Sequence, residues 1–301
     1  MREIDPLAPR IKIAALPALF TLCNAVCGFA SILVASHVRT SIVIDGIDET
    51  DKQITYIAIA SILILGGMVF DTFDGAIARV THTSSRFGAE LDSLADILTF
   101  GVAPAFLLLK LGPLDPQTML HKVYVLSATF FVVCAMLRLA RFNIHHSTHR
   151  DPDHQYFIGL PTPAAAGCVT AMAILMYDIA IARFDWVENV GLVKIIQHLL
   201  PVAVFGLSFL MVSNIRYSHQ VSQLLRRKLI FGDFVQLIVL LIIIIVTREM
   251  SLLIVFWAFA LWGPLRYVAR QFVPIGGNLY NTLGYTPPHQ DAPDPSKSED
   301  D

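Results

Sequence analysis

The chain contains apolar runs that are long enough to cross a lipid bilayer as helices. A spanning helix needs about 20 mostly apolar residues, and 55% of the 301 residues are hydrophobic while only 15% are charged. Soluble domains carry about 25% charged residues. Because backbone groups in lipid must pair within the protein, these runs predict an all-α, polytopic membrane helix bundle.

Hydropathy and turn residues predict eight spanning helices. Six of them form a core over residues 1–217, two more occupy residues 218–275, and the polar tail over residues 276–301 is expected to be disordered. An acidic loop over residues 37–54 follows the first helix. The predicted spans are Ala14–Ser36, Ile54–Val80, Phe87–Leu111, Val123–Asn143, Phe157–Ala182, Leu192–Val212, Leu229–Val246 and Leu252–Val268.

The placement of Lys and Arg predicts the orientation of these helices. With the N-terminus inside, 15 of the 22 Lys and Arg fall in inner segments, which agrees with the positive-inside rule. We therefore expect both termini at the cytoplasmic face. The net charge of −2 and the lack of a long basic run give no indication of a nucleic-acid partner.

Four aspartates lie at helical spacing in the stretch DTFDGAIARVTHTSSRFGAELDSLAD, residues 71–96. Asp71 and Asp74 share one helical face, and Asp92 and Asp96 share another. Charges at membrane depth cost about 2.5–3.5 kcal/mol each on insertion scales, so they indicate function. The turn between the two helices lets the pairs face each other at the cytoplasmic side. Four carboxylates that repel one another suit one or two hard divalent cations, Mg²⁺ or Mn²⁺.

The residues around these aspartates fit a phosphate-binding site. Gly75 lets a phosphate approach the backbone, and Ala78 keeps the same face shallow. Arg79 can bind phosphate oxygens as a charge-assisted fork, and Gly88 allows the two helices to pack tightly. The alternative, inert charges at the membrane surface, gives no reason for so regular a spacing.

The full pattern, D-x2-D-G-x2-A-R-x8-G-x3-D-x3-D, resembles the signature of the CDP-alcohol phosphatidyltransferases at every position. The resemblance implies a six-helix core that binds a CDP-linked lipid and two metal ions, transfers a phosphatidyl group to an alcohol, and releases CMP. It also implies a homodimer. All four aspartates would then bind metal, and Asp96 would also be the catalytic base. Gly75, Ala78, Arg79 and Gly88 would belong to the CDP site.

The first helix supplies two further candidates for the CDP site. Thr21 and Asn24 share a helical face and are expected to reach the nucleotide. The sequence departs from the family pattern nearby, because the family more often has an asparagine directly after the proline and this chain has Ala18 after Pro17.

Segments outside the signature bear on the acceptor alcohol. They resemble those of the integral-membrane phosphatidylserine synthases, and the resemblance extends over about two thirds of the chain. It implies CDP-diacylglycerol as donor and L-serine as acceptor. The segments are Ile97–Ala105, Arg138–Asn143, Phe157–Gly167 and Met211–Tyr217.

Arginines near the cytoplasmic ends of helices fit an acceptor that carries a carboxylate. Arg138 and Arg141 are three residues apart on one face, Asn143 adds a hydrogen-bonding amide, and Arg216 is a further candidate. These side chains could equally anchor helix ends among lipid phosphates. Inositol phosphate and glycerol phosphate would also favour arginines, and choline stays open as well, so charge alone does not select serine.

Two other classes of protein use membrane aspartates. A cation transporter would place carboxylates near the midplane of several helices and often contains internal repeats, and this sequence shows neither feature. A membrane prenyltransferase binds pyrophosphate through aspartates and metal, but it lacks the glycine, alanine and arginine of the pattern above.

Overall fold

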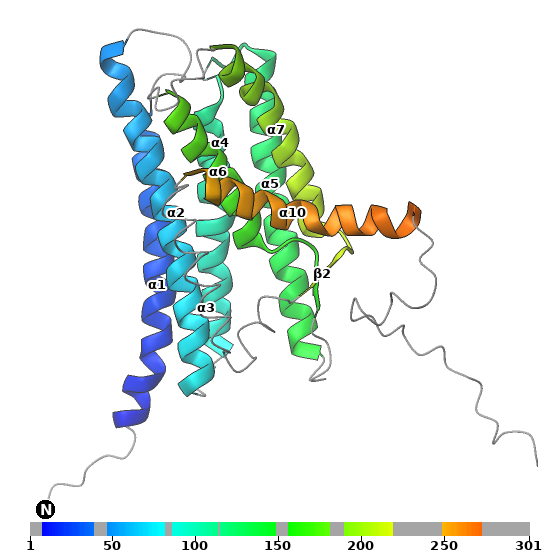
Figure 1. Ribbon diagram of the computed structural model, residues 1–301. Coiled ribbons are helices and arrows are strands. Elements are labelled where there is room, and N and C mark those ends of the chain that lie inside the picture. The colour runs from blue at the N-terminus through cyan, green and yellow to red at the C-terminus, as the bar shows by residue number, and fades with distance from the viewer. Residues whose placement is uncertain are drawn as a thin grey trace, which may run out of the picture. The chain divides into compact units, whose positions relative to one another are not determined.

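The computed structural model describes residues 8–38, 47–81, 86–113, 115–148, 156–180, 190–218 and 249–272. Contacts group Met1–Gly263 into one compact unit and Pro264–Asp301 into another. Helices dominate the first unit, as Figure 1 shows. The helices are α1 (Ala8–Ser36), α2 (Ile47–Thr81), α3 (Arg86–Asp96), the π-helix η1 (Ile97–Val102), α4 (Ala103–Leu111), α5 (Met119–Thr148), α6 (Thr162–Ala180), α7 (Val190–Val212) and α10 (Glu249–Phe272).

Six helical segments among the described residues are long and apolar enough to cross a membrane. They confirm the predicted six-helix core of a multi-pass membrane protein. The predicted seventh span, Leu229–Val246, lies outside the described residues, and the apolar stretch of α10, Ser251–Arg266, is shorter than a span. The predicted boundary after residue 217 therefore stays a prediction. The six segments are Ala18–Ser36, Thr55–Gly75, Phe87–Leu111, Met119–Ile144, Thr162–Ile179 and Lys194–Val212.

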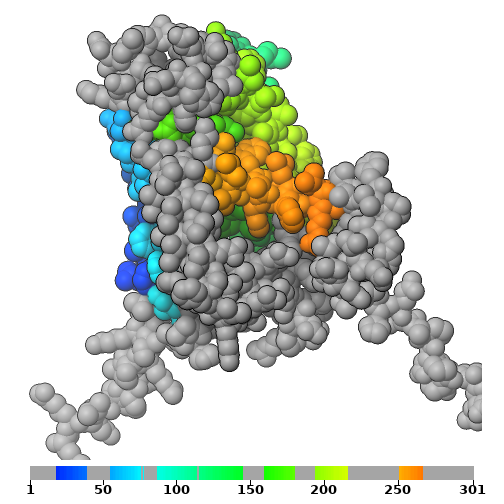
Figure 2. Space-filling view, in the orientation of Figure 1, coloured from blue at the N-terminus to red at the C-terminus, as the bar shows by residue number. Residues whose placement is uncertain are grey.

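The outer faces of α1 and α7 are apolar, as expected of helices that contact lipid. Val26 and Phe29 of α1 and Leu199 and Val202 of α7 are all more than half exposed. Figure 2 shows the blue atoms of α1 and α2 along one edge of the bundle and the yellow-green atoms of α7 along the opposite edge. Such exposure carries no penalty in a bilayer, because lipid tails are as apolar as leucine.

A π-helical segment interrupts the predicted span Phe87–Leu111 directly after Asp96. The backbone N–H of Ala103 pairs with the carbonyl of Leu98, five residues back. Pro104 follows in the first turn of α4, and a proline has no N–H to donate to the preceding turn. The wider turn therefore forms where the sequence cannot complete a regular α-helical ladder, and such turns are frequent at functional sites.

The predicted start of the fifth span at Phe157 is wrong. Residues Tyr156–Ile158 form a short strand, β1, which pairs antiparallel with β2 (Arg216–Ser218). The chain then turns at Gly159, which has a φ of 82°, a conformation that glycine adopts without strain. The helix α6 begins only at Thr162, where two flanking prolines limit the backbone N–H donors.

Candidate active site

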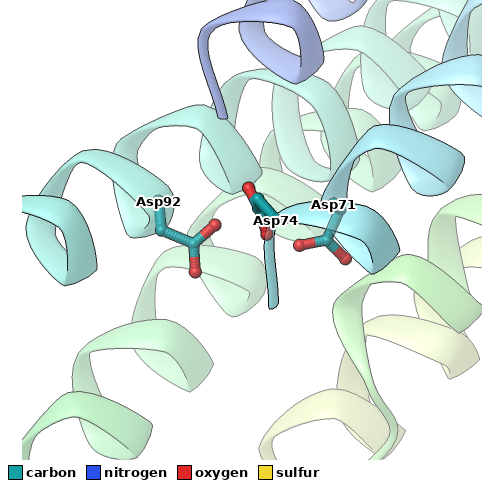
Figure 3. Close-up of side chains that lie close together, drawn as sticks. All are labelled: Asp71, Asp74 and Asp92. Carbon is teal, nitrogen blue, oxygen red and sulfur yellow. The ribbon is translucent and has the colours of Figure 1, made fainter. Parts of the chain in front are cut away.

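Three of the four signature aspartates converge where α2 and α3 meet. Asp71 and Asp74 come from α2 and Asp92 from α3, and their carboxylates point toward one another in Figure 3. Each contributes one carboxylate oxygen to a group in which all oxygens lie within 4.8 Å of one another. The structure thus brings together residues that are up to 21 positions apart in the sequence.

This group of oxygens fits a hard divalent cation. Asp74 is only 5% exposed, and Oδ1 of Asp92 is buried without a hydrogen-bond partner among the described residues. One buried and two half-buried carboxylates at this separation repel one another, because partial burial reduces the screening of charge by water. Oxygen ligands of this kind are those that Mg²⁺ and Mn²⁺ prefer. A bound cation would remove the repulsion and give Oδ1 of Asp92 its missing partner.

Two residues of α1 contact the aspartates directly. The hydroxyl of Thr21 donates to Oδ2 of Asp74 at 2.8 Å, and Nδ2 of Asn24 donates to Oδ1 of Asp96 at 3.2 Å. Asp96 is not a member of the three-oxygen group in the described part of the chain. The structure therefore places Thr21 and Asn24 against carboxylates, whereas their predicted contact with the nucleotide stays a prediction.

The small residues of the signature lie on the same two helices. Gly75 is half-buried in α2, and Gly88 is half-buried near the start of α3. Ala78 and Arg79 belong to the last turns of α2, but their side chains lie outside the described residues. The roles predicted for these four residues in CDP binding stay predictions.

Arg138 is a buried acceptor candidate. Its side chain is only 9% exposed. Its Nη1 donates to the hydroxyl of Thr162 at 2.6 Å. Its Nε is buried and has no hydrogen-bond partner within the described ranges. Arg138 thus keeps a buried donor that a ligand could use.

Arg141, one turn later on α5, is already engaged with the end of α7. Its Nη2 donates to Oδ1 of Asn214 at 2.8 Å, and its Nη1 donates to the carbonyl of Val212 at 3.4 Å. Val212 is the last residue of α7. A cation at this position satisfies a carbonyl that has no partner within the helix and complements the helix dipole. The contacts of Arg141 therefore stabilise the end of α7.

The remaining acceptor candidates give less information about the site. Nδ2 of Asn143 donates to the hydroxyl of Ser93 on α3 at 3.0 Å. This bond ties α5 to the helix that carries Asp92 and Asp96. Arg216 lies in β2, and its side chain is outside the described residues.

Sequence reasoning missed the neutral partners of the charged side chains. Ser93, Thr162 and Asn214 each hold a predicted site residue in place. Their only sequence signal is a polar residue next to an apolar segment. That signal is weak, because a hydroxyl or amide in a membrane helix often bonds only to its own backbone.

The chain is similar to known proteins over a stretch that includes the signature. Residues 14–202 match the family model described as CDP-alcohol phosphatidyltransferase. A CDP-diacylglycerol–serine O-phosphatidyltransferase of Bacillus subtilis is 33% identical over 204 residues, which cover 68% of this chain and 90% of that protein. A protein of the same name from Helicobacter pylori is 32% identical over 201 residues, 67% of this chain and 70% of its own length. Another, from Methanocaldococcus jannaschii, is 44% identical over 104 residues, 35% and 45% of the two chains.

Proposed function

Because the chain belongs to the CDP-alcohol phosphatidyltransferase family, we propose that it is a phosphatidylserine synthase of the membrane. It transfers the phosphatidyl group from CDP-diacylglycerol to the hydroxyl of L-serine and releases CMP. The observation that carries this proposal is the convergence of the signature carboxylates of Asp71, Asp74 and Asp92 within the matched residues. The relatives that carry the name CDP-diacylglycerol–serine O-phosphatidyltransferase support serine as the acceptor.

The proposed activity depends on a divalent metal, because enzymes of this family are metal-dependent in general. Asp71, Asp74 and Asp92 would hold the metal, and we propose Asp96 as a fourth ligand of a two-ion site that takes Mg²⁺ or Mn²⁺. A bound metal would neutralise charge on the pyrophosphate of the donor and stabilise the negative charge that builds on the phosphoryl oxygens during an in-line displacement.

Asp96 is the proposed base. Its carboxylate takes the proton from the serine hydroxyl while the serine oxygen bonds to the phosphorus of the phosphatidyl group. The bond from that phosphorus to the bridging oxygen breaks, and CMP leaves with the electron pair. Gly75 and Ala78 leave room for the nucleotide, and Arg79 binds phosphate oxygens. Positioning both substrates beside one carboxylate supplies much of the acceleration.

Arg138 is the residue that we propose for the serine carboxylate. It is buried, and its Nε has no hydrogen-bond partner among the described residues. A serine whose carboxylate binds Arg138 can present its hydroxyl toward Asp96. Arg141 and Asn143 already bond to Asn214 and Ser93, so we rank them after Arg138 as acceptor contacts.

Alanine variants of the two arginines separate these roles. Arg138→Ala should raise the KM for serine by about 10–100-fold, since it removes hydrogen bonds to a charged group, and should leave the KM for CDP-diacylglycerol unchanged. Arg141→Ala should instead lower the unfolding temperature in detergent, because α7 loses its cap. Steady-state kinetics and thermal unfolding of both variants are the measurements. A selective rise in the serine KM for Arg141→Ala alone would move the acceptor site to the end of α7.

The orientation and assembly of the enzyme are further parts of the proposal. The Lys and Arg distribution supports an active site at the cytoplasmic face with both termini on that side. The family resemblance supports a homodimer. We also propose that residues 1–217 form the catalytic core and that residues 218–275 add two helices to it.

The test of the function is CMP release by the purified protein in detergent. We expect release from CDP-diacylglycerol in the presence of Mn²⁺ or Mg²⁺ to require L-serine, to stop on chelation with EDTA, and to return when the metal is restored. Glycerol phosphate, inositol phosphate and choline serve as alternative acceptors. Release that responds to one of these and not to serine would keep the fold and mechanism and refute serine as the acceptor.

A further inference from the structure

We propose that Asn24 of α1 is a positioning residue for Asp96 during phosphatidyl transfer. Its backbone carbonyl accepts the hydroxyl of Thr99 of η1, and its side-chain carbonyl packs closely over Gly67 of α2. The inference rests on the proposed function, because it concerns the group that takes the proton from the acceptor.

Asn24 links α1 to both sides of the point where α3 becomes η1. The residue is completely buried, as is Thr99. Its Nδ2 donates to Oδ1 of Asp96 at 3.2 Å, and its backbone carbonyl accepts the hydroxyl of Thr99 at 2.9 Å. Asp96 and Thr99 are three residues apart, so Asn24 contacts one turn of the chain at two points. This arrangement fixes the distance between α1 and the carboxylate.

The hydrogen bond from Asn24 to Asp96 leaves the side-chain carbonyl of Asn24 without a partner among the described residues, which costs free energy. Oδ1 of Asn24 is buried and has no hydrogen-bond partner in the part of the chain that the structure describes. A carboxylate only accepts hydrogen bonds, so the NH₂ group of the amide must face Asp96 and the carbonyl must face away. An unsatisfied buried carbonyl costs about 1–3 kcal/mol. A side chain that only filled space would avoid this cost, which favours a role in function.

Gly67 provides the space that the unpaired carbonyl occupies. A Cβ atom at position 67 would lie 2.9 Å from Oδ1 of Asn24 and 2.5 Å from Cγ2 of Thr99. Both distances are shorter than a normal carbon contact, so any side chain larger than hydrogen would displace Asn24, Thr99 or both. Gly67→Ala therefore disturbs the position of Asn24 without changing a polar group.

The hydrogen bond orients the carboxylate of Asp96 through its Oδ1. Because each carboxylate oxygen has two lone pairs, the carboxylate keeps acceptor capacity for the proton of the serine hydroxyl and for a metal ion. Thr21 makes the corresponding bond to Asp74 one turn earlier on α1. Each donor of α1 therefore orients a different carboxylate. Thr21 orients Asp74, which belongs to the three-oxygen group, and Asn24 orients Asp96, which lies outside it.

The test compares Asn24→Ala, Asn24→Asp and Gly67→Ala with Ser31→Ala as a matched control. Ser31 is a buried residue of α1 whose hydroxyl donates to the carbonyl of Ala60 at 2.8 Å, and it lies about two helical turns beyond Asn24. For each purified variant we would measure kcat and KM for both substrates, the unfolding temperature, and Mn²⁺ affinity by electron paramagnetic resonance of free Mn²⁺.

We expect Asn24→Ala to lower kcat by about 10–100-fold, the usual effect of removing a residue that orients an active-site ligand, with KM values unchanged. The unfolding temperature should stay close to that of Ser31→Ala, because the substitution also removes the unsatisfied carbonyl. Asn24→Asp keeps the size but repels Asp96, and should lose at least as much kcat. Gly67→Ala should reproduce the kcat loss, and Ser31→Ala should retain full kcat.

Three outcomes would overturn the inference. The first is normal kcat in Asn24→Ala. The second is a Mn²⁺ affinity that falls as much as kcat, which would make Asn24 a residue for metal binding. The third is a loss of kcat that follows the loss of folded protein in all variants, including the control. If the wild-type protein itself shows no serine-dependent CMP release, the proposed function fails instead.

Discussion

Asp92→Asn is expected to lower kcat by about 10³-fold or more. Asp92 supplies the one oxygen of the converging group that comes from α3, and the amide keeps the shape but removes the charge. Loss of metal-assisted charge stabilisation costs several kcal/mol, and each 1.36 kcal/mol lowers the rate tenfold. The measurement is serine-dependent CMP release, together with the rise in unfolding temperature that Mn²⁺ produces in the wild-type protein and should no longer produce here.

Asp115→Asn is the matched control for that experiment. Asp115 is exposed in the connection before α5, where Oδ1 accepts the backbone N–H of Gln117. The chemical change is the same, but the residue is far along the chain from the signature. It should leave kcat and the Mn²⁺-dependent stabilisation intact. Normal turnover in Asp92→Asn, or full stabilisation of that variant by Mn²⁺, would remove Asp92 from the metal site.

Asp96→Asn is expected to lower kcat by about 10²–10⁴-fold, the range for loss of a general base. The three-oxygen group of Asp71, Asp74 and Asp92 stays intact in this variant, so stabilisation by Mn²⁺ should fall less than in Asp92→Asn, although one proposed ligand is lost. The comparison with Asp92→Asn is what separates the two roles. If Asp96→Asn loses Mn²⁺ binding to the same extent as Asp92→Asn, its main role is that of a ligand. If it keeps normal turnover, the proton goes to another group.

The parts of the fold that depend on local pattern were predictable. Long apolar runs led to six spans in the described residues, because a helix in lipid must satisfy its own backbone. The three-residue and four-residue spacing of the aspartates predicted shared faces, and the structure brings Asp71 and Asp74 together with Asp92.

The parts that depend on distant segments were not predictable. The strand at Tyr156–Ile158 forms because Arg216–Ser218 lies beside it, and nothing in its own sequence specifies that pairing. Asn24 and Thr99 are 75 residues apart in the sequence, and no local pattern predicts the hydrogen bond by which η1 is joined to α1.

The two arginines of α5 also have contacts that the sequence alone could not predict. Arg138 and Arg141 are three residues apart, and helical spacing alone gives them one face. In the structure Arg138 is buried against Thr162 of α6, while Arg141 bonds to the end of α7. Only one turn separates a side chain whose Nε has no partner among the described residues from one whose guanidinium bonds to a helix end. The burial of each arginine and the residues packed around it determine its hydrogen bonds, and helical spacing predicts neither of these.

The division of the site between helices bears on how such an enzyme can change its acceptor during evolution. The carboxylates come from α2 and α3, which are consecutive in the chain, whereas the proposed acceptor residue Arg138 lies on α5 and its partner Thr162 on α6. If this assignment holds, mutations in the later helices would alter which alcohol is accepted without changing the carboxylates that are proposed to hold the metal. One ancestral core could in this way give rise to enzymes for several head groups, each keeping the same aspartates.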